Sequence, residues 1–221
     1  MRKQIYRILA VVIALVAGGM IYLGMHPALY IGTLAQYHAT KLADAKHIVS
    51  ENKKDKAAKY NGNLAVNSLS QLEQLAKGKD KLTLRGFVSI PKIGVKLPIY
   101  EGASDKVLAL GAGTLKAGQH MGKANYAIGA HNMADNRTYF SPLQTKLKLG
   151  MHVDLVNRDK RYTYEIVQKQ VISQNTVGVI TDHDSGVATI TLITCYEEPP
   201  YFTGATKRVY AFGKLITTTL I

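Results

Sequence analysis

An uncharged apolar run near the start of the chain is the feature that most constrains its structure. Residues Ile8 to Met25 carry no charge. As a helix rising 1.5 Å per residue, the run would span about 27 Å, close to the hydrocarbon thickness of a bilayer. Basic residues precede it, and the positive-inside tendency places that short end in the cytoplasm. We therefore predict a cytoplasmic tip and transmembrane signal anchor over residues 1–32, crossing the cell membrane once, with the rest of the chain extracellular. A cleaved signal peptide is the alternative, but no clear Ala-x-Ala site follows the run.

The segment after the anchor has a different composition. Residues 33–81 are rich in Ala, Lys, Gln and Asn, and their leucines are spaced more like a helix than a strand. Asn61-Gly62-Asn63 is typical of a turn. We predict a polar, partly helical stalk that holds the following domain, residues 82–221, off the membrane. A binding helix is the alternative interpretation.

The formal net charge of +13 would permit nucleic-acid binding. However, the basic residues are spread along the whole chain, and no zinc-knuckle, helix-turn-helix or aromatic RNA-binding signature accompanies them. We therefore predict no nucleic-acid partner, and an anionic membrane or cell-wall surface matches the charge better.

Short apolar runs separated by turn residues dominate the chain after Leu82. Such runs at this spacing indicate a β-barrel or sandwich and not βαβ repeats. Helical stretches are few, with a short helix expected at Lys106 to Leu110. The predicted strands lie at residues 86–91, 95–100, 126–130, 152–156, 162–172, 188–195 and 209–215.

The only cysteine lies at the end of one of these runs. Residues 188–195 read ATITLITC, and a polar, proline-bearing segment follows at once. With one cysteine, no intramolecular disulfide is possible. A cysteine at a strand exit is held by a rigid element and yet can be open to substrate. The alternative is a buried cysteine that acts as a small hydrophobe.

Two further polar residues stand at strand ends. The segment NYAIGAH delivers His131 to the end of an apolar strand, with the small Gly129 and Ala130 beside it. His120 is a nearby competitor. Arg208 precedes the last strand, where an arginine taken alone is typical of an exposed charge.

Together these residues resemble the sortases, the enzymes that attach surface proteins to the cell wall of Gram-positive bacteria. Thr191 to Cys195 reads TLITC and matches the family's TLxTC signature. The thirteen-residue step from Cys195 to Arg208 and the small pair before His131 are similar to class A, the housekeeping type. The resemblance extends roughly from Leu84 to Leu215.

This resemblance implies an all-β fold built on an eight-stranded barrel, and a cysteine transpeptidase without a cofactor. The expected substrates are surface proteins with an LPxTG-like sorting signal, cleaved between Thr and Gly. The thioester on Cys195 would be resolved by an amine of a peptidoglycan precursor, lipid II. His131 would transfer protons, Arg208 would stabilise the oxyanion, and the backbone around Thr194 would support it.

The resemblance also implies the position of the substrate groove. The matching apolar positions are Val177, Val179 and Ile180, with Ile93 opposite, although each is equally consistent with plain strand core. Some class A members order this loop with calcium. Here the matching stretch offers Lys116, Gln119 and Lys123, and only Asp182 and Asp184 remain acidic in the loop. Calcium needs several anionic oxygen ligands, so we predict no metal site.

Two other functions remain open. A pilin-polymerising sortase of class C usually has an amino-terminal lid entering the active site and a second membrane segment, and we expect neither here. The other alternative is a non-catalytic anchored β-domain that binds peptides and buries its cysteine.

Overall fold

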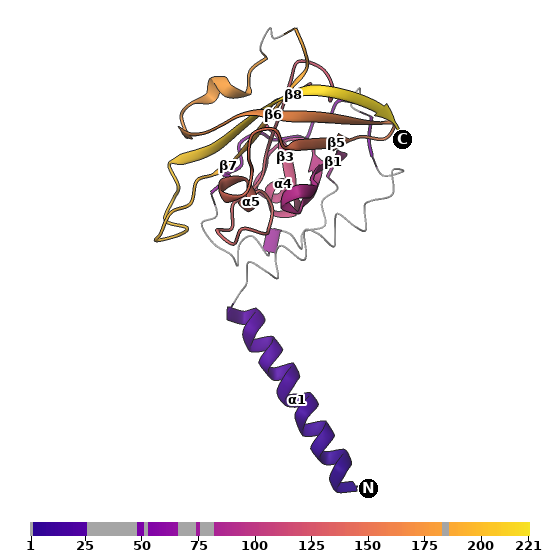
Figure 1. The fold of residues 1–221 in the computed structure, drawn as a ribbon, viewed down its shortest axis with the longest axis vertical. Helices are drawn as coiled ribbons and strands as arrows, with labels where there is room; N and C mark the ends of the chain where they lie inside the picture. The colour runs from indigo at the N-terminus through magenta and orange to yellow at the C-terminus, as the bar shows by residue number, and fades with distance from the viewer. Residues whose placement is uncertain (1, 26–47, 51–52, 66–73, 76–81, 183–185) are drawn as a thin grey trace.

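The apolar run forms a single long helix. The computed structural model describes residues 2–25, 48–50, 53–65, 74–75, 82–182 and 186–221. Helix α1 (Arg2–Met25) is continuous, and its segment Lys3–Tyr22 has a mean hydropathy of 2.1 with no residue buried against the rest of the chain (Figure 1). Length and composition therefore allow α1 to cross a membrane.

The remainder of the described chain is organised around a closed β-barrel (Figure 1). Its strand order is β1-β2-β3-β4-β7-β8-β6-β5, and only the pairs β2–β3 and β4–β7 are parallel. The predicted all-β, eight-stranded barrel is confirmed. The strands are β1 (Leu84–Ile90), β2 (Val95–Tyr100), β3 (Ala112–Thr114), β4 (Asn125–Gly129), β5 (His152–Val156), β6 (Lys160–Ser173), β7 (Thr189–Cys195) and β8 (Lys207–Leu220). The helices of this domain are η2 (Pro91–Ile93), α4 (Asp105–Leu110), α5 (Ser141–Thr145) and η3 (Val177–Ile180).

Alternating side chains build the core of the barrel. On β4, Tyr126 and Ile128 point inward, and on β7 Ile190 and Leu192 do the same, all at most 1% exposed. Successive residues of a strand face opposite sides, so the residues between them lie on the outer face of the sheet. Each fully buried aliphatic side chain contributes about 1.5–3 kcal/mol, which holds the barrel closed.

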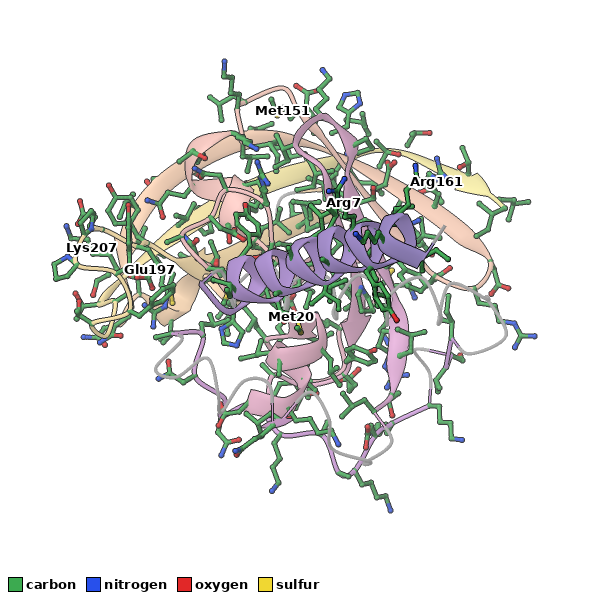
Figure 2. The ribbon with its side chains drawn as sticks, turned by 90° about the horizontal axis from the view of Figure 1, so that it is seen from below. Arg7, Met20, Met151, Arg161, Glu197 and Lys207 are labelled. Atoms are coloured by element: carbon green, nitrogen blue, oxygen red, sulfur yellow. The ribbon has the colours of Figure 1, made fainter. Side chains whose placement is uncertain are left out.

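The sequence predicted most of these elements but not all. Helix α4 begins one residue before the predicted helix, and the Ser104 hydroxyl accepts a bond from the Val107 amide at 3.3 Å as its N-cap. Strand β3 and helix α5 were not predicted. Strands β6 and β8 are longer than predicted, and they pair along their full length from Lys160–Leu220 to Ser173–Lys207. Figure 2 shows Arg161 and Lys207 on opposite sides of the molecule.

Part of the predicted stalk lies against the barrel. Residues 53–65 contain no α-helix. The Gly62 amide donates to the Ala103 carbonyl at 2.7 Å, and the Ala103 amide donates to the Lys59 carbonyl at 2.7 Å. An added Cβ on Gly62 would lie 2.2 Å from the Ala103 oxygen, so only glycine permits this approach. The described part of this segment is therefore docked on the barrel.

A buried arginine at the start of the barrel binds the same amino-terminal region. Arg85 is 3% exposed, and its Nε lies 2.6 Å from an oxygen of Glu101. Its terminal nitrogens donate to the carbonyls of Ser50 at 2.6 Å and Lys53 at 2.7 Å. One guanidinium thus joins β1, the end of β2 and the segment before the barrel.

We expect Arg85→Met to lower the free energy of unfolding by about 3–5 kcal/mol, because it removes the cation from a buried ion pair and leaves the Glu101 carboxylate, among the described residues, with only the Tyr60 hydroxyl as a side-chain partner. Urea unfolding of the detergent-solubilised chain, followed by circular dichroism, measures the loss. Arg161→Met is the matched control, since Arg161 is 52% exposed and lies 4.0 Å from Asp154. That change should cost about 0–1 kcal/mol. Equal losses in the two variants would contradict a structural role for the buried pair.

Candidate active site

Strand pairing brings the three polar residues singled out in the sequence to one end of the barrel. In the parallel β4–β7 pair, Gly129 lies beside Ile193. Continuing that register by two residues places His131 level with Cys195. In the antiparallel β7–β8 pair, Cys195 lies directly opposite Arg208. The three residues therefore come from the ends of three neighbouring strands.

The same three side chains share one face of the sheet. The inward positions are the even-numbered residues of β4 and β7 and the odd-numbered residues Val209 and Ala211 of β8. His131, Cys195 and Arg208 fall on the alternate positions, which face outward.

Lys207, the basic neighbour of Arg208, has different partners. Its Nζ lies 3.6 Å from an oxygen of Glu198 and 5.7 Å from the centre of the Tyr196 ring. Figure 2 shows Lys207, at the start of β8, and Glu197, in the connection between β7 and β8, on the same side of the molecule. Lys207 thus contacts this connection, whereas Arg208 holds the position opposite the thiol.

Thr194 fixes the strand register beside the thiol. It is fully buried, and its Oγ1 donates to the Ala130 carbonyl at 2.7 Å, while the Ala130 amide donates to the Ile193 carbonyl at 3.2 Å. The hydroxyl is therefore engaged with β4. The predicted contribution of the backbone around Thr194 to an oxyanion hole stays a prediction.

The imidazole of His131 is oriented by a backbone carbonyl. His131 is 3% exposed, and its Nδ1 lies 2.7 Å from the Leu64 carbonyl oxygen. Because a carbonyl only accepts hydrogen bonds, we assign the proton to Nδ1, which leaves Nε2 for proton transfer. The ring also packs edge-on against Tyr139, with centroids 5.9 Å apart.

One residue of the predicted stalk, Leu64, reaches this region, and the expected absence of a class C lid stays a prediction. The Leu64 side chain packs so closely on the outer face of β4 that a Cβ on Gly129 would lie 3.0 Å from its Cδ2. Sequence reasoning missed Leu64, because a backbone carbonyl gives no signal in residue type and the contact joins positions 67 apart.

Burial keeps both candidate reacting groups neutral. Burial raises the pKa of the Cys195 thiol to about 12, with Arg208 lowering it and Glu197 raising it by smaller amounts. Burial lowers the pKa of His131, against opposing contributions from the Leu64 carbonyl and Asp105. At neutral pH the pair therefore rests as a thiol and a neutral imidazole.

Arg208 is partly exposed and held by nearby oxygens. One terminal nitrogen donates to the Ala205 carbonyl at 2.7 Å and the Lys207 carbonyl at 3.0 Å. The other donates to Gln174 Oε1 at 3.2 Å. A guanidinium has five N–H donors, so donors remain beyond these three bonds within the described part of the chain.

The predicted groove residues lie in two places. Val177, Val179 and Ile180 form η3, where Val177 is 71% exposed. The Val179 carbonyl accepts from Thr191 Oγ1 at 3.2 Å, which holds η3 over the outer face of β7. Ile93 belongs to η2 and is buried in the core cluster. The groove role of all four residues stays a prediction.

The loop that holds η3 is tied down by an ion pair. Lys116 Nζ binds Asp182 Oδ1, which also accepts from the Asn125 amide at 3.2 Å. Asp184 lies outside the described residues. Within the described ranges, no group of three or more His, Cys, Asp or Glu side chains could hold a metal ion. The absence of a calcium site stays a prediction.

A strand-exit thiol level with an imidazole and opposite a guanidinium, on a closed mixed barrel, is the arrangement of a cysteine acyl-transfer enzyme. Comparison with known proteins gives the family. The Sortase domain family matches residues 88–216, and the chain belongs to the sortases, which are cysteine transpeptidases.

Individual relatives agree with this assignment. The chain is 31% identical to sortase A of Listeria monocytogenes over 186 residues, covering 84% of this chain and 78% of the relative. It is 28% identical to sortase A of Bacillus anthracis over 217 residues, covering 98% and 97%. The crystal structure of Listeria monocytogenes sortase A superposes with a TM-score of 0.57 at 33% identity, covering 62% of this chain and 90% of that one.

We expect the alkylation rate of Cys195 by iodoacetamide to keep rising above pH 9, because the thiolate is the nucleophile and the thiol pKa is raised to about 12. Arg208→Met should slow alkylation at every pH below that value, since the guanidinium lowers the thiol pKa. Mass spectrometry of the intact protein measures the rate, with Cys195→Ala as the unlabelled control. A plateau near neutral pH would contradict the neutral resting pair.

Proposed function

We propose that this sortase is of the class A type and cleaves an LPxTG-like sorting signal between Thr and Gly, with Cys195, His131 and Arg208 as its catalytic residues. The single observation that carries the proposal is the strand register. Cys195 lies directly opposite Arg208, and the β4–β7 register places His131 level with Cys195 on the same face. All three groups can therefore reach one scissile carbonyl.

The neutral resting pair determines the first step. Nε2 of His131 takes the thiol proton as the sulfur attacks the threonine carbonyl carbon. The tetrahedral intermediate collapses when the carbon–nitrogen bond to glycine breaks, and the imidazolium protonates the departing amine. The products are a thioester on Cys195 and a free glycine amine.

The second half of the reaction runs in reverse order. An acceptor amine gives a proton to Nε2 and attacks the thioester carbon, forming the new amide. The thiolate leaves and recovers the proton from the imidazolium. In both halves the guanidinium of Arg208 stabilises the oxyanion through charge-assisted hydrogen bonds.

The location of the enzyme in the cell follows from its membrane anchor and from the amine that accepts the acyl group. Helix α1 is apolar enough to span a bilayer, and the basic residues before it favour a cytoplasmic amino terminus. The barrel would then be extracellular, next to lipid II, whose peptide amine is the acceptor. Surface proteins that carry the sorting signal are the donors.

A pilin-polymerising sortase is the second candidate function. The docking of Leu64 against His131 favours it, since an amino-terminal lid is typical of class C. The chain is also similar to sortase C1 of Streptococcus suis, with 29% identity and a TM-score of 0.53. A pilin lysine would then be the acceptor amine.

The test is ligation of an LPxTG peptide to different amines, followed by mass spectrometry. We expect a ligated product with oligoglycine or an alanine-bearing peptide, and only hydrolysis with a pilin-type lysine peptide. Cys195→Ala should give neither product while keeping the fold, which circular dichroism checks. Preference for the lysine peptide would support the class C alternative, and ligation by the Cys195→Ala variant would disprove the assigned nucleophile.

We expect Arg208→Lys to reduce the transpeptidation rate roughly a hundredfold or more, the scale of losing an oxyanion donor. A lysine offers one compact ammonium on a flexible stem, whereas the guanidinium presents a planar fork. Lys207→Ala is the matched control and should lose far less, because Lys207 contacts Glu198 and Tyr196. Equal losses would indicate a general need for positive charge in place of a specific role for Arg208.

A further inference from the structure

A side-chain amide continues the pairing of β4 with β7 beyond the end of their backbone ladder. The last backbone bond runs from the Ala130 amide to the Ile193 carbonyl. Past this point, Asn132 Nδ2 donates to the carbonyl of Cys195 itself at 2.9 Å. Asn132 directly follows His131 in the chain. One side chain thus joins the segment that carries the imidazole to the residue that carries the thiol.

A second amide completes this connection from helix α5. Gln144 Oε1 accepts from Asn132 Nδ2 at 2.7 Å and from the Glu197 amide at 3.0 Å. Gln144 Nε2 donates to the Glu197 carbonyl at 2.8 Å. The amide of Gln144 therefore pairs with both backbone groups of Glu197, as a neighbouring strand would. It holds the chain two residues after the thiol.

The far end of this network reaches the connection between β7 and β8. The Glu197 side chain is also buried, and its Oε2 accepts from the Phe202 amide at 3.1 Å. The same connection supplies the Ala205 carbonyl that binds Arg208. The two amides are thus linked, through Glu197, to the segment that orients the guanidinium.

Because Asn132, Cys195 and Glu197 are buried, the hydrogen bonds of this network affect the backbone geometry around the thiol. Asn132 is 2% exposed and Cys195 is fully buried. In such surroundings, a donor or acceptor that loses its partner is not compensated by water, so the backbone shifts to find another. Catalysis is sensitive to such shifts, because a displacement of about 1 Å can cost roughly a hundredfold in rate.

We propose that Asn132 and Gln144 are positioning residues that fix the distance between the thiol of Cys195 and the imidazole of His131. Neither touches the substrate. Asn132 acts through the Cys195 carbonyl, and Gln144 acts through Asn132 and Glu197. This role rests on the proposed function, because it assumes that Cys195 and His131 react together.

Gln119, which lies before β4 and binds the backbone of Ala127 on that strand, provides a matched control. Its Nε2 donates to the Ala127 carbonyl at 2.8 Å and its Oε1 accepts from the Ala127 amide at 3.0 Å. Gln144 makes the same two-bond pairing with Glu197. The residue that Gln119 binds, Ala127, lies four residues before His131. Gln119→Ala therefore removes comparable bonds without releasing Cys195.

Steady-state transpeptidation kinetics with the LPxTG peptide and oligoglycine test the proposal. We expect Asn132→Ala and Gln144→Ala each to lower kcat roughly tenfold to a hundredfold, with the peptide KM within about twofold of the original. The double variant should lose little more than the worse single variant, because the two amides act as one unit. Gln119→Ala should keep kcat within about twofold while losing similar thermal stability.

Three results would overturn the positioning role: a kcat loss no larger than that of Gln119→Ala, a loss confined to KM, or simple multiplication of the two single effects. Iodoacetamide alkylation of Cys195 gives a readout that does not need transfer activity. Asn132→Ala should speed it severalfold by loosening the thiol, and Asn132→Asp should slow it, since a carboxylate beside the thiol disfavours the thiolate. If the unaltered protein gives no ligated product, the proposed function fails. The alkylation rates of the Asn132→Ala and Asn132→Asp variants then still show whether Asn132 holds the thiol in place.

Discussion

The parallel pairing of β4 with β7 is the constraint on which the rest of the site depends. A shift of one residue in that pairing would turn every side chain of β4 to the other face, so His131 would point into the core. The register is held by buried groups along its length: Asn125 Oδ1 accepts from Thr191 Oγ1 at 3.0 Å, and Thr194 Oγ1 donates to the Ala130 carbonyl at 2.7 Å. The inward aliphatic residues then disfavour a shifted pairing. A shift of one residue would turn polar side chains into the core and bury them without hydrogen-bond partners.

The burial of Cys195 and His131 also determines their protonation states at rest. A thiol and an imidazole in a dry site stay neutral, and ionising them together costs less than ionising either alone, because opposite charges stabilise each other. Arg208 favours the thiolate and Glu197 opposes it. In the proposed mechanism, the thiolate–imidazolium pair is therefore a minority state that forms during the attack on substrate. In that mechanism the distance between the two groups matters, because the proton passes directly from the thiol to the imidazole.

The sequence predicted what residue type and period reveal. Short apolar runs between turn residues predicted most strands, and the TLITC segment with the spacing to Arg208 predicted the candidate site. Strand β3 was missed because Ala112, Gly113 and Thr114 are small and carry no alternating pattern. Leu64 was missed because its contribution to His131 is a backbone carbonyl. Asn132 and Gln144 were missed because, apart from the bond between them, their partners in this network are backbone groups, brought near only by the closed barrel.

The docking of Leu64 has an energetic consequence for substrate binding. A peptide that enters over the outer face of β4 must displace the Leu64 side chain from Gly129, which costs up to about 1.5–3 kcal/mol of apolar burial. The exposed Val177 of η3 is available to offset that cost, because an apolar signal residue could bury it in turn. The backbone carbonyl of Leu64 has a different role from its side chain, because the carbonyl orients the imidazole of His131 through Nδ1. Under the proposed function, substrate entry therefore requires that the Leu64 side chain move while the backbone of this residue stays in place.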